Sequence, residues 1–215
     1  MAATARNVID LGLGKRALVI GQKSGMVHAI DPDSRGKLLW QTRVGQGGPL
    51  GGSQWGSASD GEKIYVAISD LGLGARPDAQ SRAGYRLVLD PKKGGGLYAL
   101  DIKTGQVAWS AAGTPCATSR TDCSPAQSAA VTATPEVVFS GSVDGHLRAY
   151  SSRTGKVVWD FETAREFPTV NGKPGHGGSL DGAGATVVDG TVFVNSGYGQ
   201  WGGMPGNVLL AFSAK

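Results

Sequence analysis

Two cysteines and three histidines are the side chains that would most readily bind a metal or act as nucleophiles. Cys116 and Cys123 lie seven residues apart in the polar segment TPCATSRTDCSP, without a CxxCH haem attachment or a second CxxC zinc half-site. This spacing favours a local disulfide that closes a loop, which indicates an oxidising compartment, and a reactive thiol pair is the alternative. No two of His28, His146 and His176 have metal-ligand spacing, so we expect isolated polar side chains and no metal site.

Aspartates occur where the chain changes direction. Asp70 and Asp144 end apolar runs, and we expect each of them to cap the turn that follows. Asp181 follows His176 in the polar connection NGKPGHGGSLDG, and the pair could border a substrate funnel instead of serving only the fold. No catalytic residue is assigned from these positions.

A repeated motif that ends in tryptophan indicates the elements that position these residues. Residues 29–40 read AIDPDSRGKLLW, residues 99–109 read ALDIKTGQVAW and residues 149–159 read AYSSRTGKVVW. Each copy is a β-like run, a polar turn closed by glycine, and a second run with tryptophan four residues after that glycine. Such recurrence is typical of stacked copies of one supersecondary unit.

The copies extend into units of four strands. The runs are rich in β-branched and aromatic residues and are separated by short polar turns, which is the pattern of an antiparallel meander. The period is roughly 45 residues, the length of one propeller blade. We therefore predict an all-β fold, a single partial β-propeller domain over residues 1–215 with about four four-stranded blades. The predicted blades are residues 7–44, 53–112, 127–163 and 181–215, with an insertion at 71–95.

The fourth unit contains only three predicted strands. Residues 7–11 are already needed as the innermost strand of the first unit, so they cannot complete the last one. Because closed propellers avoid a bare sheet edge, we expect the chain to be the C-terminal half of a larger propeller. A half-propeller that dimerises to close a ring is the alternative.

Composition excludes several classes of protein. The 35 glycines are not periodic and prolines number only 10, which excludes collagen and favours many tight turns. No run of about 18 apolar residues occurs, so no membrane span is expected. The net charge of +4 is scattered, so no nucleic-acid partner is expected. The N-terminus MAATARNVIDLGLGKR lacks the apolar core of a signal peptide, so the protein is cytosolic or the chain is part of a longer one.

The pattern Ala-x-Asp-x-x-Thr-Gly-x-x-x-Trp resembles the tryptophan-docking motif of the quinoprotein alcohol dehydrogenases. These are eight-bladed propellers that hold pyrroloquinoline quinone (PQQ) near their axis. The copy at residues 99–109 is complete, the first copy has one extra turn residue, and the third has Ser151 in place of aspartate. The resemblance implies that Trp40, Trp109 and Trp159 pack between blades and have a structural role.

The resemblance also implies residues that contact the cofactor. In GQKSGMVHAID, Lys23 matches a cation that reaches the quinone oxygens, where charge accumulates as the quinone accepts hydride. In GGSQWGSASDGEKIYVA, Gln54 and Trp55 match an Asn-Trp pair, with glutamine in place of asparagine. In SGYGQWGGMPG, Trp201 matches a tryptophan of a glycine-rich loop whose backbone N–H groups can hold anions.

Within this family the similarity is to the polyvinyl-alcohol-dehydrogenase type, through QSAAVTATPEVVFSGSVDGHLRAY and NSGYGQWGGMPGNVLLAF. It implies oxidation of alcohols, cytochrome c as electron acceptor and a periplasmic location. It also implies Ca²⁺ and an aspartate base, both held upstream of the segment that matches this chain, so we expect no metal ligands here. The alternative is a non-catalytic propeller scaffold for protein binding, like the outer-membrane assembly lipoproteins. Lys23 combined with GGSQW favours the enzyme.

Overall fold

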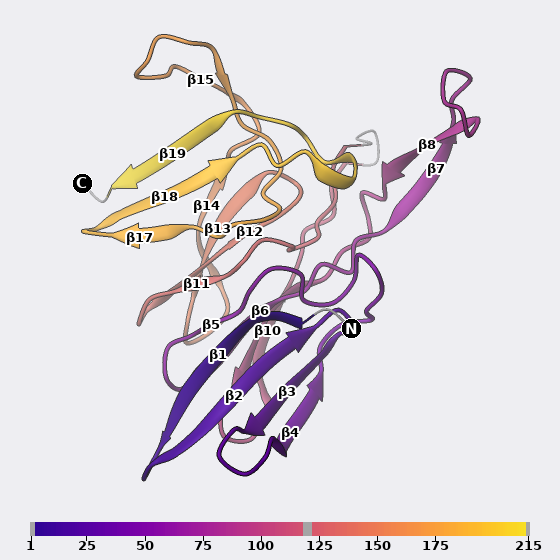
Figure 1. Cartoon of the computed structure of the whole chain (residues 1–215). Coiled ribbons are helices and arrows are strands. Elements are labelled where there is room, and N and C mark those ends of the chain that lie inside the picture. The colour runs from indigo at the N-terminus through magenta and orange to yellow at the C-terminus, as the bar shows by residue number, and fades with distance from the viewer. Residues whose placement is uncertain (1–2, 118–121, 214–215) are drawn as a thin grey trace.

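The protein is all-β in the computed structural model, which describes residues 3–117 and 122–213 (Figure 1). Three antiparallel sheets of four strands and one of three follow one another along the chain. Only one short 3₁₀ turn, η1 (Gln200–Gly202), occurs among the described residues. The prediction of an all-β chain built from four repeated sheets is confirmed.

The first and third sheets are simple meanders. The first sheet has the order β1-β2-β3-β4 and consists of β1 (Ala3–Gly12), β2 (Lys15–Gln22), β3 (Met26–Asp31) and β4 (Lys37–Arg43). The third has the order β11-β12-β13-β14 and consists of β11 (Thr132–Ala133), β12 (Val137–Gly141), β13 (His146–Ser151) and β14 (Val157–Glu162).

The second sheet carries an extra hairpin. Its strands, in the order β10-β9-β6-β5, are β5 (Ala58–Ser59), β6 (Lys63–Ala67), β9 (Gly96–Asp101) and β10 (Val107–Ala112). The insertion between β6 and β9 forms β7 (Leu73–Pro77) and β8 (Tyr85–Leu89). Figure 1 shows this hairpin extending beyond the sheets.

The fourth sheet has three strands among the described residues: β17 (Thr186–Val188), β18 (Thr191–Ser196) and β19 (Val208–Ser213). A short hairpin of β15 (Glu166–Phe167) and β16 (Gly175–His176) precedes it.

The innermost strands are shorter than the sequence predicts. The sequence pattern predicts strands over 55–59 and 128–132, whereas β5 covers only 58–59 and β11 only 132–133. The reason is that the backbone before each strand bonds to the next unit: Val131 N–H donates to Gly56 O at 3.1 Å and Ala130 N–H donates to Gly182 O at 2.9 Å. These inner segments of the second, third and fourth units therefore lie side by side, and they carry part of the candidate site.

The core lies between the faces of successive sheets and is joined by the tryptophans of the repeat. Trp40 donates its indole N–H to Ile102 O at 2.9 Å and covers Gly105, where a Cβ would lie 2.5 Å from the ring. Trp109 repeats this arrangement on the third sheet, with Ser152 O at 2.9 Å and Gly155 beneath the ring. Both residues thus pack between units, as the motif implies.

Trp159 ends the series differently. Its ring stacks on Phe161, with centroids 5.8 Å apart, and meets the edge of Phe212 in β19 at 5.1 Å. This aromatic cluster joins the third sheet to the fourth.

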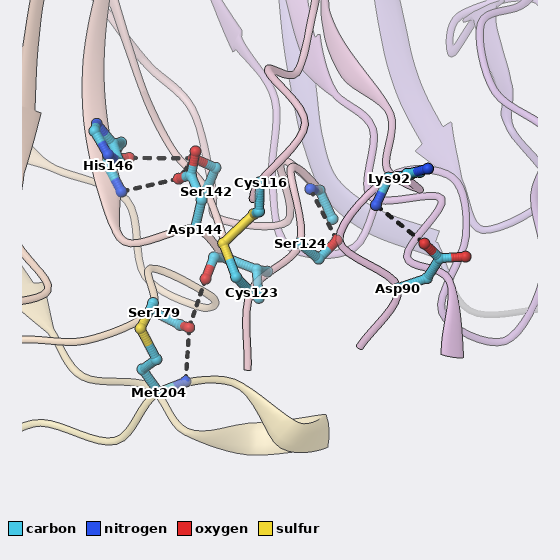
Figure 2. Close-up of a disulfide and its surroundings, with 12 residues drawn as sticks. Asp90, Lys92, Cys116, Cys123, Ser124, Ser142, Asp144, His146, Ser179 and Met204 are labelled. Carbon is cyan, nitrogen blue, oxygen red and sulfur yellow. Dashed lines mark hydrogen bonds between the residues drawn. A yellow bond between two sulfur atoms is a disulfide. The ribbon is translucent and has the colours of Figure 1, made fainter. Parts of the chain in front are cut away.

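A disulfide links Cys116 and Cys123, as the cysteine spacing predicts (Figure 2). Cys123 is buried, and Cys116 N–H donates to Pro91 O at 2.9 Å. Ser124 next to the bridge donates to Lys93 O at 2.8 Å. The bridged loop therefore supports the base of the β7–β8 insertion.

Candidate functional site

The four residues predicted to contact a cofactor line one cavity of about 490 Å³. Lys23 comes from the turn between β2 and β3, and Trp201 comes from η1. Gln54 and Trp55 precede β5. The remaining lining residues are Pro49, Leu50, Ser69, Leu71, Leu73, Ser128, Asp181 and Gln200. Segments far apart in the sequence thus meet at one concave site.

A glycine-rich loop over residues 45–52 forms the wall beside Lys23. The carboxylate of Asp70 accepts backbone N–H groups from Gln46, Gly47 and Gly52 at 2.7, 3.1 and 2.8 Å. Gly52 has a φ of +63°, and a Cβ there would lie 2.4 Å from Gln22 O, so only glycine allows this close approach. Asp70 was expected to cap its own turn, but it organises a loop 18 to 24 residues earlier.

Lys23 provides the positive charge of the cavity. Its ammonium donates to Pro49 O at 2.9 Å, which anchors the side chain to the glycine-rich loop. Its own carbonyl accepts Gly48 N–H at 2.9 Å. A lysine ammonium has three N–H donors, so this anchor leaves donors that can bind a ligand oxygen.

Gln54 and Trp55 are held in different ways. Gln54 donates its amide to Gly51 O at 2.6 Å, which ties it to the same loop. Trp55 is 45% exposed and donates its indole N–H to Asp181 Oδ1 at 3.0 Å. Its ring also forms a T-shaped pair with Tyr198, with centroids 6.2 Å apart and planes at 80°. The second and fourth units therefore meet at Trp55.

The electrostatic state of Asp181 follows from its place in the cavity. Burial raises the pKa of its carboxyl group, while the hydrogen bond from Trp55 and the positive charge of Lys23 act in the opposite direction, with burial dominant. Asp181 and Lys23 line the same cavity, so their opposite charges influence each other there.

The insertion and η1 also line the cavity. Leu71 and Leu73 present apolar surface to the cavity, and Leu89 at the end of β8 packs near Gly202. Trp201 has a φ of 55°, in the left-handed region, and its residue is 58% exposed while it lines the cavity. The insertion was identified from the sequence, but its contribution to this cavity was not.

Sequence reasoning separated some contributors correctly and missed others. The sequence places Asp181 and His176 together at a possible funnel; Asp181 lines this cavity, whereas His176 lines a different cavity with Phe167 and Asn207. Ser69 and Ser128 were missed; their hydroxyls, 2.7 Å apart, are buried at the cavity wall. Only the fold could identify them, since isolated serines carry no motif.

The described residues contain neither a recognisable metal-binding group nor a membrane-spanning helix. Among residues 3–117 and 122–213, no group of three or more His, Cys, Asp or Glu side chains is arranged to hold a metal ion. The same residues include no helix with the length and apolar character needed to cross a membrane.

The cavity combines one cation, one carboxyl group, two side-chain amides, two indoles and three leucines. Its size lies within the usual range of small-molecule sites, which is about 300–1,000 Å³. Indole faces and leucines suit a flat conjugated ring, and Lys23 suits a polar oxygen on its rim.

Comparisons with known proteins agree with this architecture. A family model described as outer membrane protein assembly factor BamB matches residues 23–214. A polyvinyl alcohol dehydrogenase from a Pseudomonas species is 46% identical over 213 residues, which is 93% of this chain and 30% of that protein. The chain spans about 30% of the length of the curated relatives that it matches.

Two solved structures share the fold. BamB from Moraxella catarrhalis has a TM-score of 0.56 and 22% identity, and the match covers 99% of this chain and 47% of that one. A europium-containing methanol dehydrogenase has a TM-score of 0.57 and 16% identity, with 94% and 40% covered. Since the family model covers most of the chain, the protein belongs to this family of PQQ-type propellers, which includes the PQQ-dependent alcohol dehydrogenases that its sequence resembles.

Proposed function

We propose that this chain is part of a PQQ-dependent alcohol dehydrogenase of the polyvinyl alcohol type and contributes to its PQQ site. The observation that carries the proposal is the convergence of Lys23, Gln54, Trp55 and Trp201 on one cavity. The name of the 46% identical relative supports an alcohol as substrate.

The residues present fit a group with the chemistry of PQQ, which is a flat, conjugated o-quinone bearing carboxylates. Trp55 and Trp201 offer indole surface, and Leu50, Leu71 and Leu73 offer apolar contact. Lys23 supplies a cation for the oxygen atoms of such a ring.

When bound, PQQ supplies an o-quinone that accepts two electrons and a proton equivalent from the alcohol carbon as hydride. Lys23 would keep a positive charge beside oxygens on which negative charge develops, and its bond to Pro49 O pre-organises it for that role. Gln54, fixed to Gly51 O, would offer its amide to a polar edge of the ligand. The two indoles would exclude water from the ring faces.

The remaining machinery is proposed from the family resemblance. We expect the Ca²⁺ ligands and the aspartate base to lie on other parts of the propeller, and cytochrome c to accept the electrons. The rest of the ring would come from the N-terminal half of the protein or, alternatively, from self-association. A periplasmic location is supported by the Cys116–Cys123 disulfide, since disulfides persist in oxidising compartments.

A non-catalytic scaffold for protein binding is the competing function, because the matching family model is described as an outer-membrane assembly factor. A scaffold has no use for a lysine and two indoles around one cavity. The two functions therefore differ in whether this cavity binds PQQ.

Titration of the full chain with PQQ and Ca²⁺, followed by tryptophan fluorescence and calorimetry, tests the proposal. We expect saturable quenching, and Lys23→Met should weaken binding at least tenfold, on the order of 1.4 kcal/mol. Lys103→Met is the matched control, because Lys103 is an exposed lysine outside the cavity. The absence of saturable binding, or equal losses in both variants, would favour the scaffold.

A further inference from the structure

Asp181 holds Trp55 across a long sequence separation. The indole N–H of Trp55 donates to Asp181 Oδ1 at 3.0 Å, and 126 residues separate the two positions. Both residues line the cavity. Since the Trp55 side chain is 45% exposed, surrounding packing alone does not fix the plane of its ring.

The backbone on either side of Asp181 is anchored. Leu180 N–H donates to Ser142 O at 3.0 Å, and Gly182 O accepts Ala130 N–H at 2.9 Å. Leu180 and Gly182 are also buried. The carboxylate is therefore mounted on a fixed segment, whereas its partner is a half-exposed indole. The anchored Asp181 therefore restrains the Trp55 side chain.

Tyr198 completes the support. Its ring forms a T-shaped pair with Trp55, with centroids 6.2 Å apart. Gly182 has a φ of +148°, and a Cβ there would lie 3.3 Å from the Tyr198 ring, so the Asp181–Gly182 turn packs against this tyrosine. Two contacts from the fourth unit thus fix one indole that precedes the second sheet.

We propose that Asp181 is the positioning residue for Trp55: its carboxyl oxygen fixes the indole plane so that the ring forms one wall against a flat conjugated ligand. The identity of that ligand as PQQ rests on the proposed function, but the fixing of the indole does not. A hydrogen bond to a charged acceptor is stronger than one to a neutral acceptor, and this suits a side chain that solvent would otherwise compete for.

The ligand-free test uses acrylamide quenching and near-UV circular dichroism of the full chain. The signal of Trp55 is isolated as the difference from a Trp55→Phe variant. Asp181→Ala should increase the quenching of Trp55 about twofold or more, because the indole loses its acceptor. Asp181→Asn, which keeps a carbonyl oxygen, should restore most of the native signal. Asp189→Asn, an exposed aspartate of the β17–β18 turn, is the control.

The ligand test titrates PQQ into the same variants. Asp181→Ala should weaken binding about tenfold and Asp181→Asn by no more than about threefold. Unchanged Trp55 quenching in Asp181→Ala, or an asparagine variant as impaired as alanine, would overturn the positioning role. If the wild-type chain binds no PQQ while Trp55 still loosens in Asp181→Ala, the proposed function fails and the positioning role stands.

Discussion

Two turns in this molecule share one backbone hydrogen-bond pattern but differ in what their side chains contact. Residues 22–25 join β2 to β3, and residues 142–145 join β12 to β13; each has a glycine with positive φ whose N–H donates to the first residue of the turn at 3.0 Å. In each, that glycine's carbonyl accepts an N–H at 2.8 Å from the residue after the fourth strand, Val44 or Thr163.

The difference lies in the side chains. The second position is Lys23 in the first turn, at the cavity, and the buried Val143 in the other. The third position is Ser24 in the first turn and Asp144 in the other, where Arg148 donates to it at 2.8 Å. The repeat thus sets the backbone, while single side chains decide whether a turn contributes to the cavity or to the core.

The ionic network of the third sheet extends this contrast. Arg148 also donates to Ser142 Oγ at 2.8 Å and to Asp160 at 3.1 Å, and His146 Nδ1 lies 2.6 Å from Asp160. Burial works against the charge of Arg148, but the hydrogen bond and attraction of Asp144 outweigh it and raise the pKa of the guanidinium.

Removing Arg148 should have the largest effect. Arg148→Met leaves the buried Asp144 carboxylate without its partner, and we expect a loss of about 3–5 kcal/mol in the free energy of unfolding. Urea denaturation measures it. His28→Met, at the equivalent position of the first sheet, is the control and should cost under about 1 kcal/mol. Similar losses at both positions would contradict the contrast between the two turns.

A second change tests what the repeats share. Gly155→Ala would drive a Cβ to within 2.5 Å of the Trp109 ring, and Gly172→Ala has the same φ of +70° with nothing within 4 Å. Both variants carry the backbone strain, so their difference isolates the tryptophan contact. We expect Gly155→Ala to be about 1–3 kcal/mol less stable by thermal or urea unfolding. Equal stability of the two variants would mean that the Trp109 ring can move aside without loss of unfolding free energy.

A third prediction concerns acidification. Because the pKa of Asp181 is raised in the folded chain, the native state binds this proton more tightly than the unfolded chain does. This stabilising contribution is fully present at pH values below the pKa of Asp181 in the unfolded chain. It is lost as the pH rises through the raised pKa of the folded chain. The wild type should therefore gain stability over Asp181→Asn as pH falls from 7 towards 4. A Tm difference that does not change with pH would contradict this.

The smallest expected effect converts one turn into the other. Lys23→Val reproduces the second residue of the 142–145 turn, and the side chain's bond to Pro49 O is solvent-accessible. We expect a change in unfolding free energy within about 0.5 kcal/mol. A large loss of stability in urea would show that Lys23 serves the fold as well as the cavity.

The fold was largely predictable because the docked tryptophans and turn glycines recur at fixed offsets. The pattern of each repeat predicts its own strands, and the positions of Trp40 and Trp109 predict how neighbouring repeats pack. The shortness of β5 and β11 was not predictable, since it depends on bonds such as Val131 N–H to Gly56 O between units.

The site was predictable only where a motif marks it. Lys23, Gln54 and Trp55 follow from recognisable segments, and the structure brings them to one cavity; their contact with a cofactor stays a prediction. Asp70 and Ser128 act at this cavity through contacts 18 to 59 residues away in sequence, and local pattern cannot reveal such contacts.

The bonds between inner segments also bear on folding kinetics. Each sheet is built from neighbours in sequence and can form early, but the Trp55–Asp181 contact closes a loop of 126 residues. Contacts of such separation form slowly, because the entropy of loop closure must be met before they add stability. The cavity should therefore be among the last parts to form during refolding. The fluorescence emission of Trp55 can be used to follow that step.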